Sequence, residues 1–169
     1  MRSPLLAVAV LTALALPVTA AQAQTVHDHL DEPTAVASPR AATVHLRPRA
    51  WEAKVIALTN ARRTAHGVKP LRAARCPRRF AAPWARHMAR IQLLVHHSSL
   101  GRLLHCGSSA HTAGENIAWN YDTPRSVVRG WMSDPPHRHN LLDPAFTRIG
   151  VAGARLGHGA TYAIQDFVG

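Results

Sequence analysis

Acidic residues are scarce in this sequence and missing from a long part of it. The 169 residues hold nine Asp and Glu against twenty Lys and Arg, which gives a formal net charge of +11. No acidic residue lies between Glu52 and Glu115. The basic residues in that window include Arg62, Arg63, Lys69, Arg72, Arg75, Arg78, Arg79, Arg86, Arg90 and Arg102. Such a face should attract anionic lipid head groups or phosphate-rich envelope polymers, and the alternative is a solvated arginine-rich face without a partner.

Aromatic residues are also few, at 5% of the chain. They fall at spacings typical of a core rather than of a platform on which bases stack, and no nucleic-acid-binding motif accompanies the positive charge. We therefore expect no nucleic-acid partner.

Long apolar runs are missing except near the N-terminus. Arg2 precedes an apolar stretch from Leu5 to Leu16, which is too short to span a bilayer, and Ala21-Gln22-Ala23 fits the small-x-small rule for signal cleavage. A membrane anchor is the alternative, but the apolar run does not extend past Val18. We predict that residues 1–23 are a signal peptide and that the protein is secreted.

The next segment, residues 24–50, lacks aromatic residues and contains Pro33, Pro39 and Pro48. A stretch of this composition cannot bury enough apolar surface to offset the entropy lost on ordering, so we predict a disordered linker. Residues 51–169 are then long enough for one domain with a core of its own.

Only two cysteines are present, Cys76 and Cys106. In an exported protein an even pair predicts one disulfide, which would stabilise the fold by roughly 3.5 kcal/mol on the chain-entropy model. A cysteine nucleophile is the alternative, and export to an oxidising space argues against it.

The apolar spacing predicts helices followed by strands. A helix is expected over residues 51–65, with Val55, Leu58, Ala61 and Ala65 on one stripe, and another over 77–91, with a core stripe of Phe80, Trp84, Met88 and Ile91. A third helix should follow the Thr123-Pro124 cap and end at Pro135-Pro136. Strands are expected around residues 117–119, 149–154 and 161–168. This order indicates an α+β fold in which helices pack on a small antiparallel sheet.

Several ordered motifs carry a family resemblance. They are Gly114-Glu115-Asn116, then Trp131-x-x-Asp134, then the run from His137-Arg138 through Asn140-Leu141-Leu142 to Ile149-Gly150-Val151. With the segments 57–71 and 162–167, these motifs resemble the bacterial branch of the CAP superfamily, which includes cysteine-rich secretory proteins, insect venom antigens and plant pathogenesis-related proteins. The resemblance spans residues 51–169. It implies a three-layer α–β–α sandwich with a cleft that carries two His and two acidic residues.

The resemblance assigns four residues to this cleft. His97 and His137 match its two histidines, Glu115 matches the acid of the GEN motif, and Asp134 matches a second acidic position at which many relatives have Glu. His96 is the alternative to His97 in register. We also expect His96 and Asn116 to contribute to binding, with the Asn116 amide holding loop backbone.

Two imidazoles and two carboxylates without a thiolate suit Zn²⁺, and also Mn²⁺ or Mg²⁺ with waters, in a weak site that loses the cation below about pH 6. The resemblance implies a binding or adhesive module for lipid or envelope, with a small hydrophobic ligand as a further partner. The first alternative is a metal-assisted peptidase or esterase in which Glu115, His97 and His137 activate a cation-bound water. A serine route is disfavoured because no nucleophile elbow surrounds Ser98 or Ser133. An inert scaffold is the remaining alternative.

Overall fold

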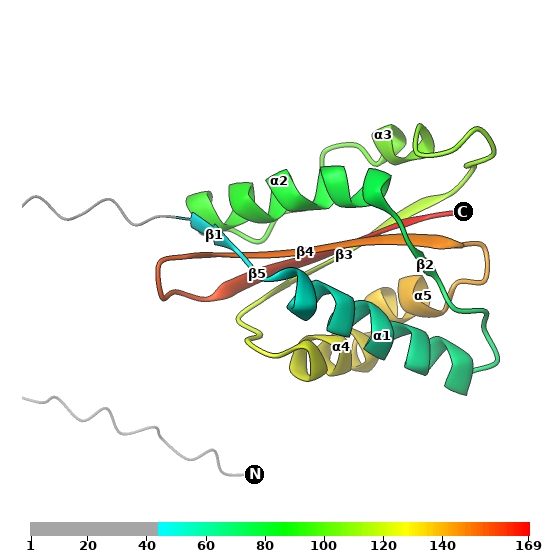
Figure 1. Ribbon diagram of the computed structural model, residues 1–169, viewed down its shortest axis with the longest axis horizontal. Helices are drawn as coiled ribbons and strands as arrows, with labels where there is room; N and C mark the ends of the chain where they lie inside the picture. The colour runs from blue at the N-terminus through cyan, green and yellow to red at the C-terminus, as the bar shows by residue number, and fades with distance from the viewer. Residues whose placement is uncertain (1–43) are drawn as a thin grey trace, which may run out of the picture. The chain divides into compact units, whose positions relative to one another are not determined.

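The computed structural model describes residues 44–169 (Figure 1). The predicted signal peptide and all but the last residues of the predicted linker lie outside the described residues. The elements are β1 (Val44–Leu46), α1 (Arg49–Ala65), β2 (Arg72–Ala73), α2 (Arg75–Ile91), α3 (Gly101–Leu104), β3 (Ala113–Trp119), α4 (Pro124–Ser133), α5 (Pro135–Leu142), β4 (Arg148–Leu156) and β5 (Thr161–Val168). Between residues 44 and 169, no helix has the length and apolar character needed to cross a bilayer.

The strands form one sheet with the order β1-β4-β5-β3. Neighbours on this path are antiparallel, as predicted. The short β2 differs from the prediction because it pairs in parallel with β4 through Arg72 and Ala73. The folded domain begins before Trp51, because β1 lies in the segment that we assigned to the linker. Its residues are ordered by backbone hydrogen bonds to β4, which do not depend on the aromatic side chains that this segment lacks.

Helices cover both faces of the sheet, which confirms the three-layer α–β–α arrangement. In Figure 1, α2 and α3 lie on one side of the strands, and α1, α4 and α5 lie on the other. Successive residues of a strand point to opposite faces, so Ile117 and Ile164 are buried with α2, whereas Val151 and Phe167 belong to the core beneath the other helices. Because both faces are buried, β5 has buried side chains along its whole length.

Helix α2 meets the sheet through small side chains rather than through the predicted aromatic stripe. Ala81, Ala85 and Ala89 are fully buried together with Met88. Phe80, Trp84 and Ile91, which we predicted to be core, are only partly buried or exposed. The small residues allow close approach, and at Gly150 of β4 an added Cβ would overlap the backbone at the start of α2.

Helix α1 buries a polar stripe that the apolar pattern did not reveal. Its buried positions are Trp51, Glu52, Val55, Thr59 and Arg63, whereas Leu58 is partly buried and Ala61 and Ala65 are exposed. The Arg63 guanidinium donates to the carbonyls of Lys69, Leu141, Asp143 and Phe146 at 2.8–3.1 Å. A buried cation is tolerated here because four carbonyl oxygens satisfy its donors.

The predicted third helix begins where expected, with a capping box between Thr123 and Ser126. Its predicted end is also correct, since α4 stops at Ser133. However, Pro135 and Pro136 do not lead into a loop. They begin α5, because proline suits the first turn of a helix, where its missing N–H costs nothing.

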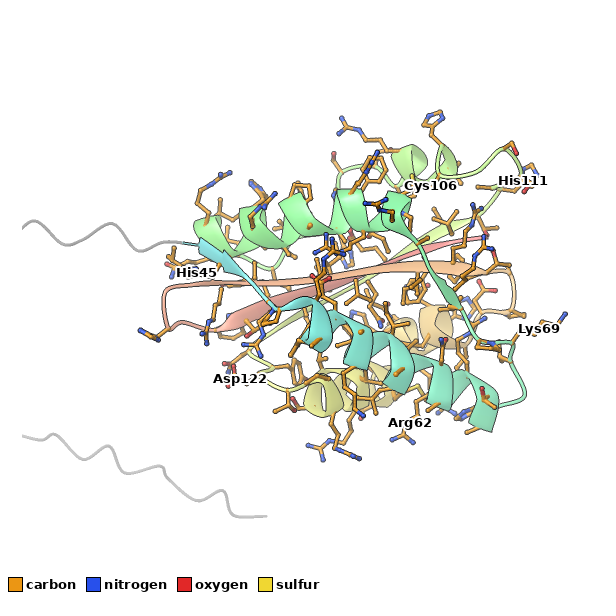
Figure 2. The ribbon with its side chains drawn as sticks, in the orientation of Figure 1. His45, Arg62, Lys69, Cys106, His111 and Asp122 are labelled. Atoms are coloured by element: carbon orange, nitrogen blue, oxygen red, sulfur yellow. A yellow bond between two sulfur atoms is a disulfide. The ribbon has the colours of Figure 1, made fainter. Side chains whose placement is uncertain are left out.

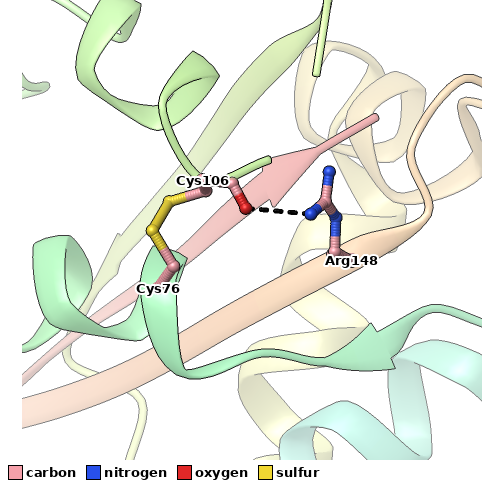
Figure 3. Close-up of a disulfide and its surroundings, with 3 residues drawn as sticks. All are labelled: Cys76, Cys106 and Arg148. Atoms are coloured by element: carbon pink, nitrogen blue, oxygen red, sulfur yellow. Dashed lines mark hydrogen bonds between the residues drawn. A yellow bond between two sulfur atoms is a disulfide. The ribbon is translucent and has the colours of Figure 1, made fainter. Parts of the chain in front are cut away.

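The predicted disulfide joins Cys76, in the first turn of α2, to Cys106, which follows α3. The two Cα atoms are 5.4 Å apart. Figure 3 shows that Arg148 of β4 also reaches this point, where its Nη1 donates to the Cys106 carbonyl at 2.9 Å. The disulfide and Arg148 therefore hold the far end of the segment that links α2 to β3.

Candidate functional site

The Glu115 carboxylate is the centre of the site. It projects from β3 toward the α2 side of the sheet, and its side chain is only 1% exposed. His97 Nδ1 makes a hydrogen bond with Glu115 Oε2, and the His97 backbone N–H donates to Oε1 at 3.1 Å. His96 Nδ1 lies 2.6 Å from the same Oε1. Both histidines reach Glu115, but the His97 side chain is 18% exposed and that of His96 is 59% exposed, so His97 is the one enclosed in the site.

These hydrogen bonds decide the ionisation of Glu115. Burial alone would raise the pKa of this carboxyl, because it disfavours the charged form. The hydrogen bonds from His97 and His96 outweigh burial and hold the Glu115 pKa below its ordinary value. Glu115 is therefore an anion at neutral pH.

Trp84 positions the His97 ring. The two rings stack with centroids 4.2 Å apart, and the Trp84 indole N–H donates to the Val95 carbonyl at 2.9 Å. Trp84 thus fixes both the imidazole and the backbone that leads to it. The sequence pattern missed this role because an aromatic residue at helical spacing predicts core packing.

Asp166 is a further acid at this site that sequence reasoning did not select. It is fully buried on β5, directly opposite Glu115 in the strand register. Neither of its carboxylate oxygens has a hydrogen-bond partner in the described part of the protein. Burial, and then the negative charge of Glu115, raise the Asp166 pKa well above its ordinary value. The sequence held one sign of this role, because Asp166 is an acidic residue within the largely apolar strand from Tyr162 to Val168.

The three side chains form a compact set of potential ligands. One ligand atom each from His97, Glu115 and Asp166 can be chosen so that all lie within 4.8 Å of one another. Two carboxylates and one imidazole suit a divalent cation of hard to borderline character. A cation would also offset the repulsion between Glu115 and Asp166.

Asp134 and His137 form a second hydrogen-bonded pair through Oδ2 and Nδ1. They are not members of the His97, Glu115 and Asp166 set. Asp134 lies between α4 and α5, and His137 lies in the first turn of α5. Both line a groove of about 320 Å³, whose walls include Leu94, Ile117, Trp119 and Tyr121.

Asn116 and its neighbour Asn140 connect the backbone at Glu115 to the backbone at His137. It is fully buried and points to the opposite face of the sheet from Glu115. Its amide donates to the His137 carbonyl at 3.1 Å, and its oxygen accepts from Asn140 at 3.0 Å. Asn140 also donates to the Glu115 carbonyl at 3.0 Å. Asn116 therefore braces the backbone of α5, whereas we expected its amide to hold loop backbone.

The family model for the cysteine-rich secretory protein family, CAP, matches residues 56–167. The chain belongs to this family. The CAP domain is 38% identical over 125 residues to the uncharacterized protein YkwD of Bacillus subtilis, an alignment that covers 71% of this chain and 48% of YkwD. The chain therefore spans about half the length of that relative.

Solved structures share the CAP fold. An extracellular protein from Bacillus anthracis that contains an SCP domain is 25% identical, with a TM-score of 0.59, and the match covers 70% of this chain and 40% of that one. An outer surface protein of Borrelia burgdorferi is 14% identical, with a TM-score of 0.67, over 75% of this chain and 98% of that one. At that identity the second match supports the fold alone.

Proposed function

We propose that this CAP domain is an exported module that reversibly binds a divalent cation through His97, Glu115 and Asp166 and docks on an anionic envelope surface. The observation that carries the cation proposal is that the buried Asp166 carboxylate makes no hydrogen bond within residues 44–169. Its two buried oxygens have no hydrogen-bond partner among the described residues and face a second carboxylate. Buried acids are normally paired, so this arrangement is better suited to an ion than to a metal-free interior.

The composition of the site indicates a weak and exchangeable ion. No thiolate takes part, and three protein ligands leave coordination positions for water. Zn²⁺ is the favoured ion because imidazole and carboxylate both bind it, and Mn²⁺ is the second choice. Metal ligands must be deprotonated to bind, so acid should release the ion.

Titration calorimetry of chelator-treated protein with zinc tests this proposal. We expect one site in the unmodified protein and its loss in Asp166→Asn, because the amide keeps the shape of the side chain and removes the anionic ligand. Asp134→Asn is the matched control: it makes the same change in the second pair and should keep the site. Equal zinc binding by the unmodified protein and Asp166→Asn would contradict the proposal.

The outer face of α2 supports docking on an anionic surface. Arg79, Arg86 and Arg90 are exposed along it, and no acid interrupts the sequence between Glu52 and Glu115. An extracellular protein is among the structural relatives, which agrees with such a location.

Co-sedimentation with vesicles that contain phosphatidylglycerol tests docking. Binding should fall as salt is raised, because screening weakens attraction between exposed charges. Arg86→Gln/Arg90→Gln should bind less than the unmodified protein. Arg62→Gln/Arg72→Gln, which removes two exposed charges outside α2, is the matched control. Binding that does not change with salt would count against docking by charge.

A further inference from the structure

Four large apolar side chains are exposed in the described part of the protein, and they lie at or just after the ends of α2 and β3. Their exposed fractions are 37% for Ile91, 59% for Leu93, 47% for Leu94 and 52% for Trp119. Leu94 and Trp119 line the same groove, which brings the end of α2 next to the end of β3. We call these four residues the apolar edge.

Two residues with positive φ end the elements that carry the apolar edge. Gln92, directly after α2, adopts a left-handed conformation with φ of 55°, which ends the helix and carries Leu93 and Leu94 out of it. Asn120 does the same after β3, with φ of 67°, so Trp119 is the last residue of its strand. Non-glycine residues rarely adopt this conformation, and both do so next to the apolar edge.

The apolar edge continues a basic stripe. Arg79, Arg86 and Arg90 are exposed at spacings of seven and four residues, which places them on one side of α2. Leu93 and Leu94 lie three and four residues after Arg90. The acid that lines the adjoining groove is Asp134, which is hydrogen-bonded to His137. This side of α2 therefore presents exposed arginines that lead to the apolar edge.

We propose that the apolar edge inserts into the head-group region of an anionic phospholipid bilayer while Arg79, Arg86 and Arg90 contact lipid phosphates. This inference rests on the proposed envelope docking and names its partner. Tryptophan and leucine beside arginine are the side chains that favour a membrane interface. An anionic polymer would attract the arginines but would give no reason for exposed leucines. A second copy of this chain is disfavoured because each copy carries a formal charge of +11.

Vesicle partitioning with Leu93→Ser/Leu94→Ser tests the inference. Binding to equimolar phosphatidylglycerol and phosphatidylcholine should fall about tenfold or more, because two leucines no longer leave water. The slope of binding against salt should stay the same, since the arginines are intact. Both sites are exposed, so the thermal midpoint of the variant should match that of the unmodified protein, and its measurement excludes unfolding as the cause.

Trp119 provides an independent readout of insertion. Lipids brominated near the head group should quench part of the tryptophan fluorescence on binding, and Trp119→Phe should remove that quenchable part while the buried Trp51 and Trp131 remain.

Three outcomes would overturn the inference. Unchanged partitioning of the leucine variant, with salt-sensitive binding retained, would leave a purely electrostatic docking and keep the proposed function. A lipid-free dimer that the leucine variant abolishes would make the edge a self-association surface. Tryptophan fluorescence insensitive to brominated lipid would show that Trp119 stays outside the membrane.

Discussion

Two neighbouring buried carboxyls have pKa values that are shifted in opposite directions. Glu115 keeps its charge because two histidines donate to it, so its pKa is lowered. Asp166 has no such donor, so burial and the nearby Glu115 raise its pKa. The two residues differ in their partners, because Glu115 accepts hydrogen bonds from two histidines whereas Asp166 faces the negative charge of Glu115.

This contrast predicts how stability depends on pH. A raised pKa in the folded state means that folding favours neutral Asp166. Its contribution to stability is therefore complete below the pKa of an unfolded carboxyl, about 4, and is lost as the pH rises through the raised folded value. Asp166→Asn removes this loss. In the presence of chelator, the variant should become more stable relative to the unmodified protein as the pH rises from about 4 toward neutrality.

Urea unfolding across this range, with and without zinc, measures the effect. Zinc should stabilise the unmodified protein and leave Asp166→Asn unchanged, which reverses their order at neutral pH. A stability difference that stays constant with pH would show that Asp166 does not titrate as described.

At the scale of elements, α1 is held by a polar anchor. Arg63 reaches the backbone that runs from α5 into β4 and donates to three of its carbonyls, and to that of Lys69. Arg62, the adjacent residue, is exposed, and Figure 2 shows it on the outer side of α1. The two arginines therefore provide a matched comparison on one helix.

We expect Arg63→Met to lower the free energy of unfolding by about 3 kcal/mol or more, because it leaves buried carbonyl oxygens without a donor. Arg62→Met should change it by less than about 0.5 kcal/mol. Equilibrium urea unfolding of both variants at neutral pH makes the comparison. Similar losses in the two variants would mean that the buried hydrogen bonds contribute little.

At the scale of the whole molecule, the disulfide links one helical layer to the segment that carries His97. Cys76 and Cys106 are 30 residues apart, and the segment between them includes most of α2, His96 and His97. The bond therefore restricts the unfolded chain and also limits the motion of the loop beside Glu115.

Cys76→Ser/Cys106→Ser should lower the free energy of unfolding by roughly 3.5 kcal/mol on the chain-entropy model. Calorimetric unfolding measures this loss, and reduction of the unmodified protein should reproduce it. Reductant should have no effect on the serine variant. If the oxidised protein and the variant unfold at the same temperature, the bond does not stabilise this fold.

The sequence predicted those features that depend on a short stretch of neighbouring residues. Thr123 and Pro124 predicted the start of α4. The family motifs placed His97, Glu115, Asp134 and His137 in one cleft, and the structure shows hydrogen bonds within the His97–Glu115 pair and within the Asp134–His137 pair. The α2 stripe was wrong because alanines give a weak periodic signal, so the larger Phe80 and Trp84 dominated the pattern. Asp166 was missed because its partner Glu115 is adjacent only through strand register. That register depends on the whole sheet.

The alternation of β3 has a consequence for how such domains change over generations. Glu115 and Asn116 are neighbours in sequence, yet one faces the potential ligands and the other braces the backbone in the opposite layer. A substitution at the first therefore alters the proposed cation site and its contacts with His97, whereas one at the second alters the contact between β3 and α5. Two domains of this architecture can therefore differ in the proposed cation site while they keep the same bracing of β3.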